Sequence, residues 1–185
     1  MLGVRVTAHA VVNLAEHRRR EAAGMAAVID PALLDRLLDL PVGVPVIDPA
    51  WWAGQFPGIL ERDPEGVSVT RRLESPLSIA DVVVQTAAGR ELRAVQDASL
   101  FAGFTRRWVA ADRVPDAMLL EAKLCGVGIL DADHKVLWPA AKPVALTRDG
   151  WSWLLEEKVY RRWLGGRPRG RARGRAEVKP LAGPA

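Results

Sequence analysis

The chain has no long hydrophobic run, and its 185 residues include one cysteine and one tyrosine. A helix that crosses a bilayer needs about 20 consecutive apolar residues, and no segment approaches that length. With Cys125 alone, no disulfide can form within the chain, which fits a reducing compartment. The N-terminal apolar run has its charges after it, the reverse of a secretory signal. We therefore expect a cytoplasmic protein with no membrane association.

The net positive charge of the chain is confined to one segment. The formal net charge is +4, yet residues 165–185 alone hold five Arg, one Lys and one Glu. The remainder is close to neutral and lacks the overall positive charge that is usual in duplex-binding domains. Because residues 165–185 mix Arg with Gly, Ala and Pro and show no apolar periodicity, we predict a disordered basic tail.

Arginine binds phosphate through paired hydrogen bonds, so the tail predicts nucleic-acid binding without sequence preference. A solubilising extension is the other interpretation. Arg also outnumbers Lys 21 to 5, a bias typical of GC-rich bacterial genomes. The candidate nucleic-acid-binding residues of the tail are Arg167, Arg169, Arg171, Arg173 and Arg175.

The first sixty residues predict an N-terminal helical segment that leads into a connector. Residues 14–29 suit a helix with a basic stretch. In residues 30–40, Asp30 suits an N-cap, Pro31 suits the first helical position, and leucines recur on one face. The Pro- and Gly-rich stretch that follows predicts a connector, to which Trp51 and Trp52 belong. We assign residues 1–60 to this segment.

From about residue 67 the pattern changes to strands mixed with helices. Trp151, Leu155, Val159 and Trp163 recur at four-residue steps, which predicts one buried face on the last helix. This order predicts an α/β (α+β) domain over residues 61–164, with a central mixed β-sheet flanked by helices. The predicted strands are 67–73, 79–85, 91–97, 106–111, 127–131 and 135–140, and the predicted helices are 112–126 and 149–164.

Two acids bracket the second and third predicted strands. Asp81 begins one strand, and Asp97 ends the next. They are either ordinary acids of a hairpin or the ligands of a metal ion, and both interpretations stay open. Carboxylate oxygens are the ligands that Mg²⁺ prefers, and divalent cations activate water for phosphodiester hydrolysis.

Residues 81–99 together with 106–140 resemble the PD-(D/E)XK, or restriction-endonuclease-like, nuclease superfamily. The resemblance covers roughly residues 67–140. It implies a nuclease that uses Mg²⁺ or Mn²⁺, with Asp81 as the first acid and Asp97 as the second. Ser99 stands where the superfamily has a catalytic lysine, which implies a degenerate site.

Other residues complete the implied site. Gln96 would replace Asp97 if a one-residue bulge shifted the strand. Arg106, Arg107 or Lys123 would supply the displaced cation, and Arg106 and Arg107 would also contact nucleic acid. Lys123 belongs to a Glu-x-Lys pattern, but its segment predicts a helix, in which residues two apart point in different directions. The candidate catalytic residues are therefore Asp81, Asp97, Gln96 and Lys123, and the candidate metal ligands are Asp81 and Asp97.

Two functional hypotheses follow. The first is a divergent nuclease-fold protein that binds or acts on DNA or RNA, with weak or lost metal-dependent activity. The alternative is a non-enzymatic bacterial interaction or regulatory module, associated with a mobile element or a defence system. It would use the same fold as a scaffold and contact a protein through Trp51, Trp52 and the Trp-rich last helix. No cofactor other than Mg²⁺ or Mn²⁺ is expected.

Overall fold

The computed structural model describes residues 6–47, 57–143, 148–166 and, by their backbone alone, 175–178. The chain forms two compact units, each assembled from separate segments. We call the first the α/β unit, which comprises Met1–Val11, Ile79–Thr147 and Arg171–Ala185. The second, the helical unit, comprises Val12–Ser78 and Arg148–Gly170. The sequence suggested divisions near residues 60 and 165. In the structure, each unit contains residues from before and after residue 60.

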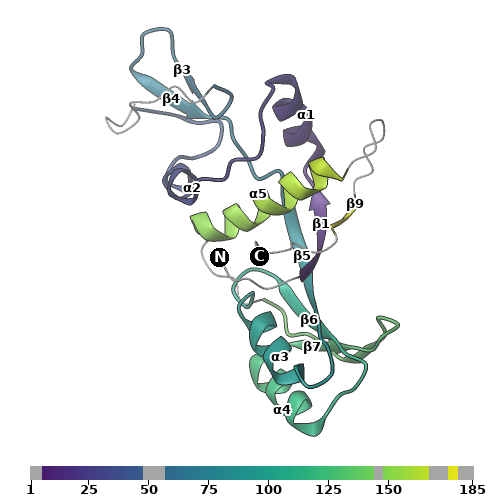
Figure 1. Cartoon of the computed structure of the whole chain (residues 1–185). Helices are drawn as coiled ribbons and strands as arrows, with labels where there is room; N and C mark the ends of the chain where they lie inside the picture. The colour runs from purple at the N-terminus through teal and green to yellow at the C-terminus, as the bar shows by residue number, and fades with distance from the viewer. Residues whose placement is uncertain (1–5, 48–56, 144–147, 167–174, 179–185) are drawn as a thin grey trace. The chain divides into compact units, whose positions relative to one another are not determined.

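The α/β unit is built on a mixed six-stranded sheet with the order β8-β7-β6-β5-β1-β9 (Figure 1). Strand β5 pairs parallel with β6, and β6 pairs parallel with β7. The β7–β8 and β1–β9 pairs are antiparallel. The predicted fold class, a mixed sheet with helices, is confirmed. The strands are β1 Val6–Val12, β5 Leu77–Gln85, β6 Arg106–Ala110, β7 Gly128–Leu130, β8 Val136–Trp138 and β9 Arg175–Val178.

Two helices connect the parallel strands. Helix α3, Glu91–Ser99, joins β5 to β6, and α4, Asp116–Cys125, joins β6 to β7. Right-handed crossovers that advance in one direction place both helices on one face of the sheet, where α3 and α4 pack together (Figure 1). Helix α4 ends, as predicted, at Gly126, whose φ of 63° is a left-handed conformation that glycine adopts without strain.

The prediction of a strand at residues 91–97 is wrong, because this segment is helix α3. Parallel strands require a crossover connection, and a hairpin cannot supply one. The buried residues Ala94, Val95 and Ala98 follow helical spacing, so the helix covers the sheet with one face. The short apolar and polar alternation within "ELRAVQD" fits a strand equally well, which explains the error.

The helical unit combines three helices with a small antiparallel sheet of order β2-β4-β3. Asn13 caps α1, and Asp30 caps α2 as predicted, while Asp149 and Ser152 form a capping box at the start of α5. The elements are α1 Leu14–Ala22, α2 Pro31–Leu38, β2 Pro45–Ile47, β3 Leu60–Arg62, β4 Ser68–Arg71 and α5 Gly150–Gly165.

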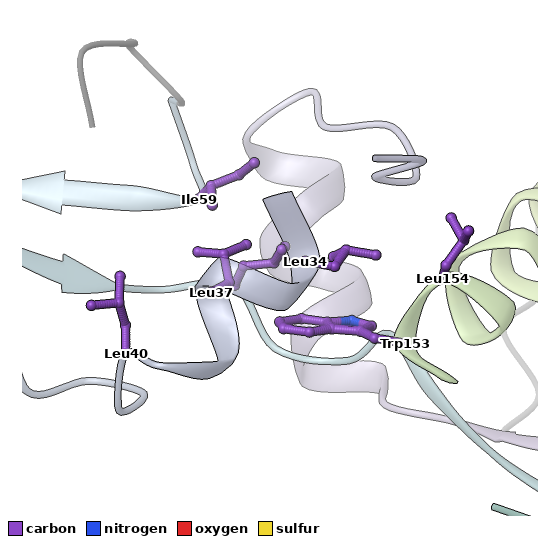
Figure 2. Close-up of a cluster of buried hydrophobic side chains, with 7 residues drawn as sticks. Leu34, Leu37, Leu40, Ile59, Trp153 and Leu154 are labelled. Atoms are coloured by element: carbon purple, nitrogen blue, oxygen red, sulfur yellow. The ribbon is translucent and has the colours of Figure 1, made fainter. Parts of the chain in front are cut away.

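An apolar cluster between α2 and α5 forms a core of the helical unit (Figure 2). Leu34, Leu37 and Trp153 are fully buried in it. The predicted stripe on α5 was wrong at its first residue, because Trp151 is 59% exposed whereas Trp153 is 0% exposed. Helix α5 buries a wide surface that a single four-residue stripe does not describe. The cluster consists of Leu34, Leu37, Leu40, Ile59, Leu73, Trp153 and Leu154.

Both ends of the chain differ from expectation. In its described part, the N-terminal segment that was expected to be helical starts with strand β1, and the helix expected over 14–29 ends at Ala22. Within the tail expected to be disordered, Arg175–Val178 form β9. The other tail arginines, Trp51 and Trp52 lie outside the described residues. No helix in the described part of the chain is long and apolar enough to cross a membrane.

Candidate functional site

Asp81 lies on β5, directly opposite Arg106 in the parallel register with β6. Arg106 Nε and Nη2 each lie 2.9 Å from one of the two carboxylate oxygens, so the ion pair is bidentate. Trp108, two residues further along β6, donates from its indole Nε1 to Asp81 Oδ1 at 2.8 Å. These three side chains, which we call the Asp81 cluster, share one face of the sheet because strand side chains alternate.

The position of Trp108 depends on a glycine in the next strand. A Cβ atom at Gly128 would clash with the Trp108 ring and would lie 2.7 Å from the backbone nitrogen of Ala140. Gly128 therefore lets the indole lie across β7 while its N–H reaches Asp81. The cluster comes from β5 and β6, and β7 makes room for it.

The Asp81 cluster is a poor fit for a divalent cation. Both carboxylate oxygens accept hydrogen bonds from Arg106 or Trp108, and the guanidinium neutralises the carboxylate. A Mg²⁺ ion would have to displace that cation. Among the residues that the structure describes, no three His, Cys, Asp or Glu side chains are grouped to hold a metal ion.

The second candidate acid lies on a helix instead of a neighbouring strand. Asp97 is on α3, where its Oδ1 lies 3.0 Å from Arg93 Nε one turn earlier. Gln96 is exposed on the same helix, and the Ser99 hydroxyl donates to the Gln96 carbonyl at 2.7 Å. The layout of two acids on adjacent strands, on which the metal hypothesis depended, is absent at these residues.

The remaining candidate cations have other contacts. Lys123 Nζ lies 4.5 Å from the centre of the Trp138 ring. Arg107 is buried, and its Nη2 donates at 2.7 Å to the carbonyl of Cys125 at the C-terminus of α4. This contact places a positive charge at the negative end of the α4 dipole, which is a favourable interaction. Arg106 is about half exposed at 49%, so of these three arginines and lysines only Arg107 is sequestered.

Sequence reasoning missed a buried charged cluster in the helical unit. Arg20, fully buried, donates from Nη1 and Nη2 to the two oxygens of Glu157, at 2.8 and 2.7 Å. Its Nε donates to Glu16 at 2.7 Å, and Nη2 also donates to the Glu74 carbonyl at 2.8 Å. We call Arg20, Glu16 and Glu157 the Arg20 network. The Glu16–Arg20 spacing of four residues was visible in the sequence, but Glu157 is 137 residues from Arg20.

The Arg20 network satisfies its own charges. Burial alone would lower the pKa of Arg20, but the hydrogen bonds and charges of Glu157 and Glu16 raise it above its usual value. The Val28 backbone N–H donates to Glu157 at 2.9 Å. Next to the network, His17 Nδ1 lies 2.8 Å from the Tyr160 hydroxyl. With its charges paired inside the protein, the network fastens α1 to α5.

Two further titratable groups have shifted pKa values. Burial raises the pKa of Glu156, although Arg148 and the Ser75 hydroxyl, which donates at 2.5 Å, oppose the shift. Burial, followed by the charge of Glu121, raises the pKa of the Cys125 thiol. A thiol with a raised pKa is a weak nucleophile near neutral pH, so Cys125 does not suit nucleophilic catalysis.

No protein-family model, no curated protein and no solved structure matches this chain. The resemblance to the PD-(D/E)XK superfamily therefore stays a prediction.

Proposed function

We propose that this protein is a non-catalytic interaction module, in which the α/β unit presents the outer surface of α3 and α4 to a macromolecular partner. The observation that carries the proposal is a set of exposed large apolar side chains. Leu120 and Leu124 on α4 are 61% and 76% exposed. These two residues are one turn apart on the helix and so are neighbours on its surface, and contiguous exposed apolar surface marks interaction sites in soluble proteins. The set on α3, α4 and the turn after α3 is Leu92, Leu100, Phe104, Leu120 and Leu124.

The Asp81 cluster supports the non-catalytic part of the proposal. A general base or metal ligand needs a carboxylate oxygen that is available to water or to an ion. In the Asp81 cluster, Arg106 and Trp108 occupy both oxygens of Asp81. The same contacts give Asp81 a structural task, which is to hold β5 and β6 in register.

A cleavage assay tests the proposal. Purified protein with Mg²⁺ or Mn²⁺ should leave single- and double-stranded DNA and RNA intact. Isothermal titration with Mn²⁺ should show no binding. Cleavage that is lost in both Asp81→Ala and Asp97→Ala would refute the proposal and establish a metal-dependent nuclease. Asp133→Asn, an exposed turn acid, is the control for a nonspecific loss of charge.

Nucleic-acid binding through the tail is a second candidate function, favoured by the concentration of arginine in residues 165–185. Affinity should fall steeply with salt, because each phosphate contact releases counterions. Replacing Arg167, Arg169, Arg171 and Arg173 by Gln should abolish binding to a labelled 20-mer and leave residues 175–178 unchanged. Fluorescence anisotropy at two salt concentrations measures this, and binding that survives the four substitutions would place the contact elsewhere.

A further inference from the structure

Helix α4 carries an outward-facing stripe that is complementary to itself. Its buried side holds Met118 and Ala122, which face the opposite direction from Leu120. At about 100° per residue, the residues within about 60° of Leu120 lie on the outer surface. All of them are exposed, and they are Asp116, Ala117, Lys123 and Leu124.

The charged residues of this stripe lie along one edge, and the apolar residues that differ in size lie along the other. Asp116 and Lys123 lie about 40° and 60° to one side of Leu120, and Ala117 and Leu124 lie about 60° and 40° to the other side. Along the axis, Asp116 lies about 6 Å before Leu120 and Lys123 about 4.5 Å after it. One edge therefore has an acid at its start and a base at its end, while the other has a small residue and then a large one.

We propose that two copies of this chain associate through antiparallel packing of α4 against α4, with a twofold axis at Leu120. This rests on the proposed function, since it names the partner of the same apolar surface. The twofold axis reverses the helix direction but keeps each edge against the same edge of the partner. Asp116 of each copy then meets Lys123 of the other, and Leu124 packs over Ala117.

Charge complementarity favours a second copy over an unrelated partner. The antiparallel dimer contains the Asp116–Lys123 contact two times, once on each side of the twofold axis, and it places the two helix dipoles antiparallel. Lys123 also lies beside the Trp138 ring, with Nζ 4.5 Å from the ring centre. A ten-residue helix is about 15 Å long, so the seam is short and the dimer is weak, with micromolar affinity.

Sedimentation velocity of the full chain over a range from low to high micromolar concentration tests the proposal. The wild-type protein should shift from monomer to dimer. Leu120→Glu should raise the dissociation constant at least about tenfold, because it places two carboxylates together at the axis. Leu137→Ser, an exposed apolar residue on β8, is the matched control and should leave the dissociation constant unchanged.

Charge reversal tests the antiparallel register. Asp116→Lys and Lys123→Asp should each weaken the dimer by roughly tenfold, and the double variant should restore it. Circular dichroism checks that every variant is folded. A monomer at all concentrations, a dimer unaffected by Leu120→Glu, or a double variant as weak as either single would overturn the α4 pairing. None of these results bears on catalysis, which the cleavage assay decides separately.

Discussion

The two units of this protein place a bidentate arginine–carboxylate pair at different depths. The helical unit buries Arg20, Glu16 and Glu157 completely or nearly so, and pairs them with one another. The α/β unit pairs Asp81 with a half-exposed Arg106 and leaves Leu120 and Leu124 on its surface. The charged pair is buried in the helical unit and screened by solvent in the α/β unit. Exposed apolar side chains occur in both units, since Trp151 of the helical unit is 59% exposed, but Leu120 and Leu124 lie one turn apart on a single helix, α4, and form the apolar surface that we propose binds a partner.

The largest expected effect comes from breaking the Arg20 network. Arg20→Met should lower the free energy of unfolding by about 3–5 kcal/mol, because it leaves the buried Glu157 without its cation. Adding Glu157→Gln should recover part of this loss, since Gln is uncharged and its carbonyl still accepts from the Val28 N–H. Urea denaturation followed by circular dichroism measures both. A double variant less stable than Arg20→Met would contradict this account.

The Asp81–Arg106 pair of the α/β unit is expected to contribute less to stability than the buried Arg20 network. Arg106→Met should lower the free energy of unfolding by less than about 1 kcal/mol, because solvent reaches the pair through the half-exposed Arg106 side chain and screens it. The same urea denaturation measures this variant. If Arg106→Met and Arg20→Met lowered the free energy of unfolding equally, the expected difference between the pairs of the two units would be wrong.

Much of the fold followed from local patterns in the sequence. Asp30 and Pro31 marked the start of α2, and Gly126 marked the end of α4, because these residues have strong backbone and capping preferences. The mixed sheet followed from the strand pattern. Helix α3 did not, because nothing in a nine-residue segment shows that the flanking strands are parallel.

The candidate site was less predictable than the fold. The sequence identified Asp81 and Arg106 separately, but their pairing depends on the register of β5 against β6. The role of Trp108 depends on the missing side chain of Gly128 in a third strand. The Arg20 network was missed because "EHRRR" resembles a solvated helix face, and the second carboxylate comes from α5. Each of these contacts joins residues that are distant in the sequence.

A smaller effect on stability is expected at Glu156, a carboxylate of the helical unit. Because burial raises its pKa, the folded protein binds this proton more tightly than the unfolded chain does. The corresponding stability is present at low pH and is lost as the pH rises from the ordinary value of 4.5 through the raised folded pKa. Glu156→Gln has no ionisable group at this position, so it does not lose this stability as the pH rises.

Denaturation at several pH values measures the effect. The stability of Glu156→Gln relative to the wild type should increase as the pH rises through this window. Glu61→Gln, which removes an exposed carboxylate paired with Arg72, is the control for the loss of a surface charge. A difference between Glu156→Gln and the wild type that stays constant with pH would contradict the raised pKa.

The smallest effect is expected at Cys125 in the α/β unit. Burial and then the charge of Glu121, whose carboxylate lies 3.7 Å from the sulfur, raise the thiol pKa, so iodoacetamide should react slowly at neutral pH. Glu121→Gln removes the nearby negative charge and should lower that pKa and speed alkylation, while the urea-unfolded wild type and variant should react at similar rates. Mass spectrometry of the alkylated fraction against time measures this. Equal alkylation rates in the folded wild type and variant would show that burial alone raises the pKa of Cys125. The Glu121 carboxylate would then have no influence on the thiol, in contrast to the influence of Glu16 and Glu157 on Arg20.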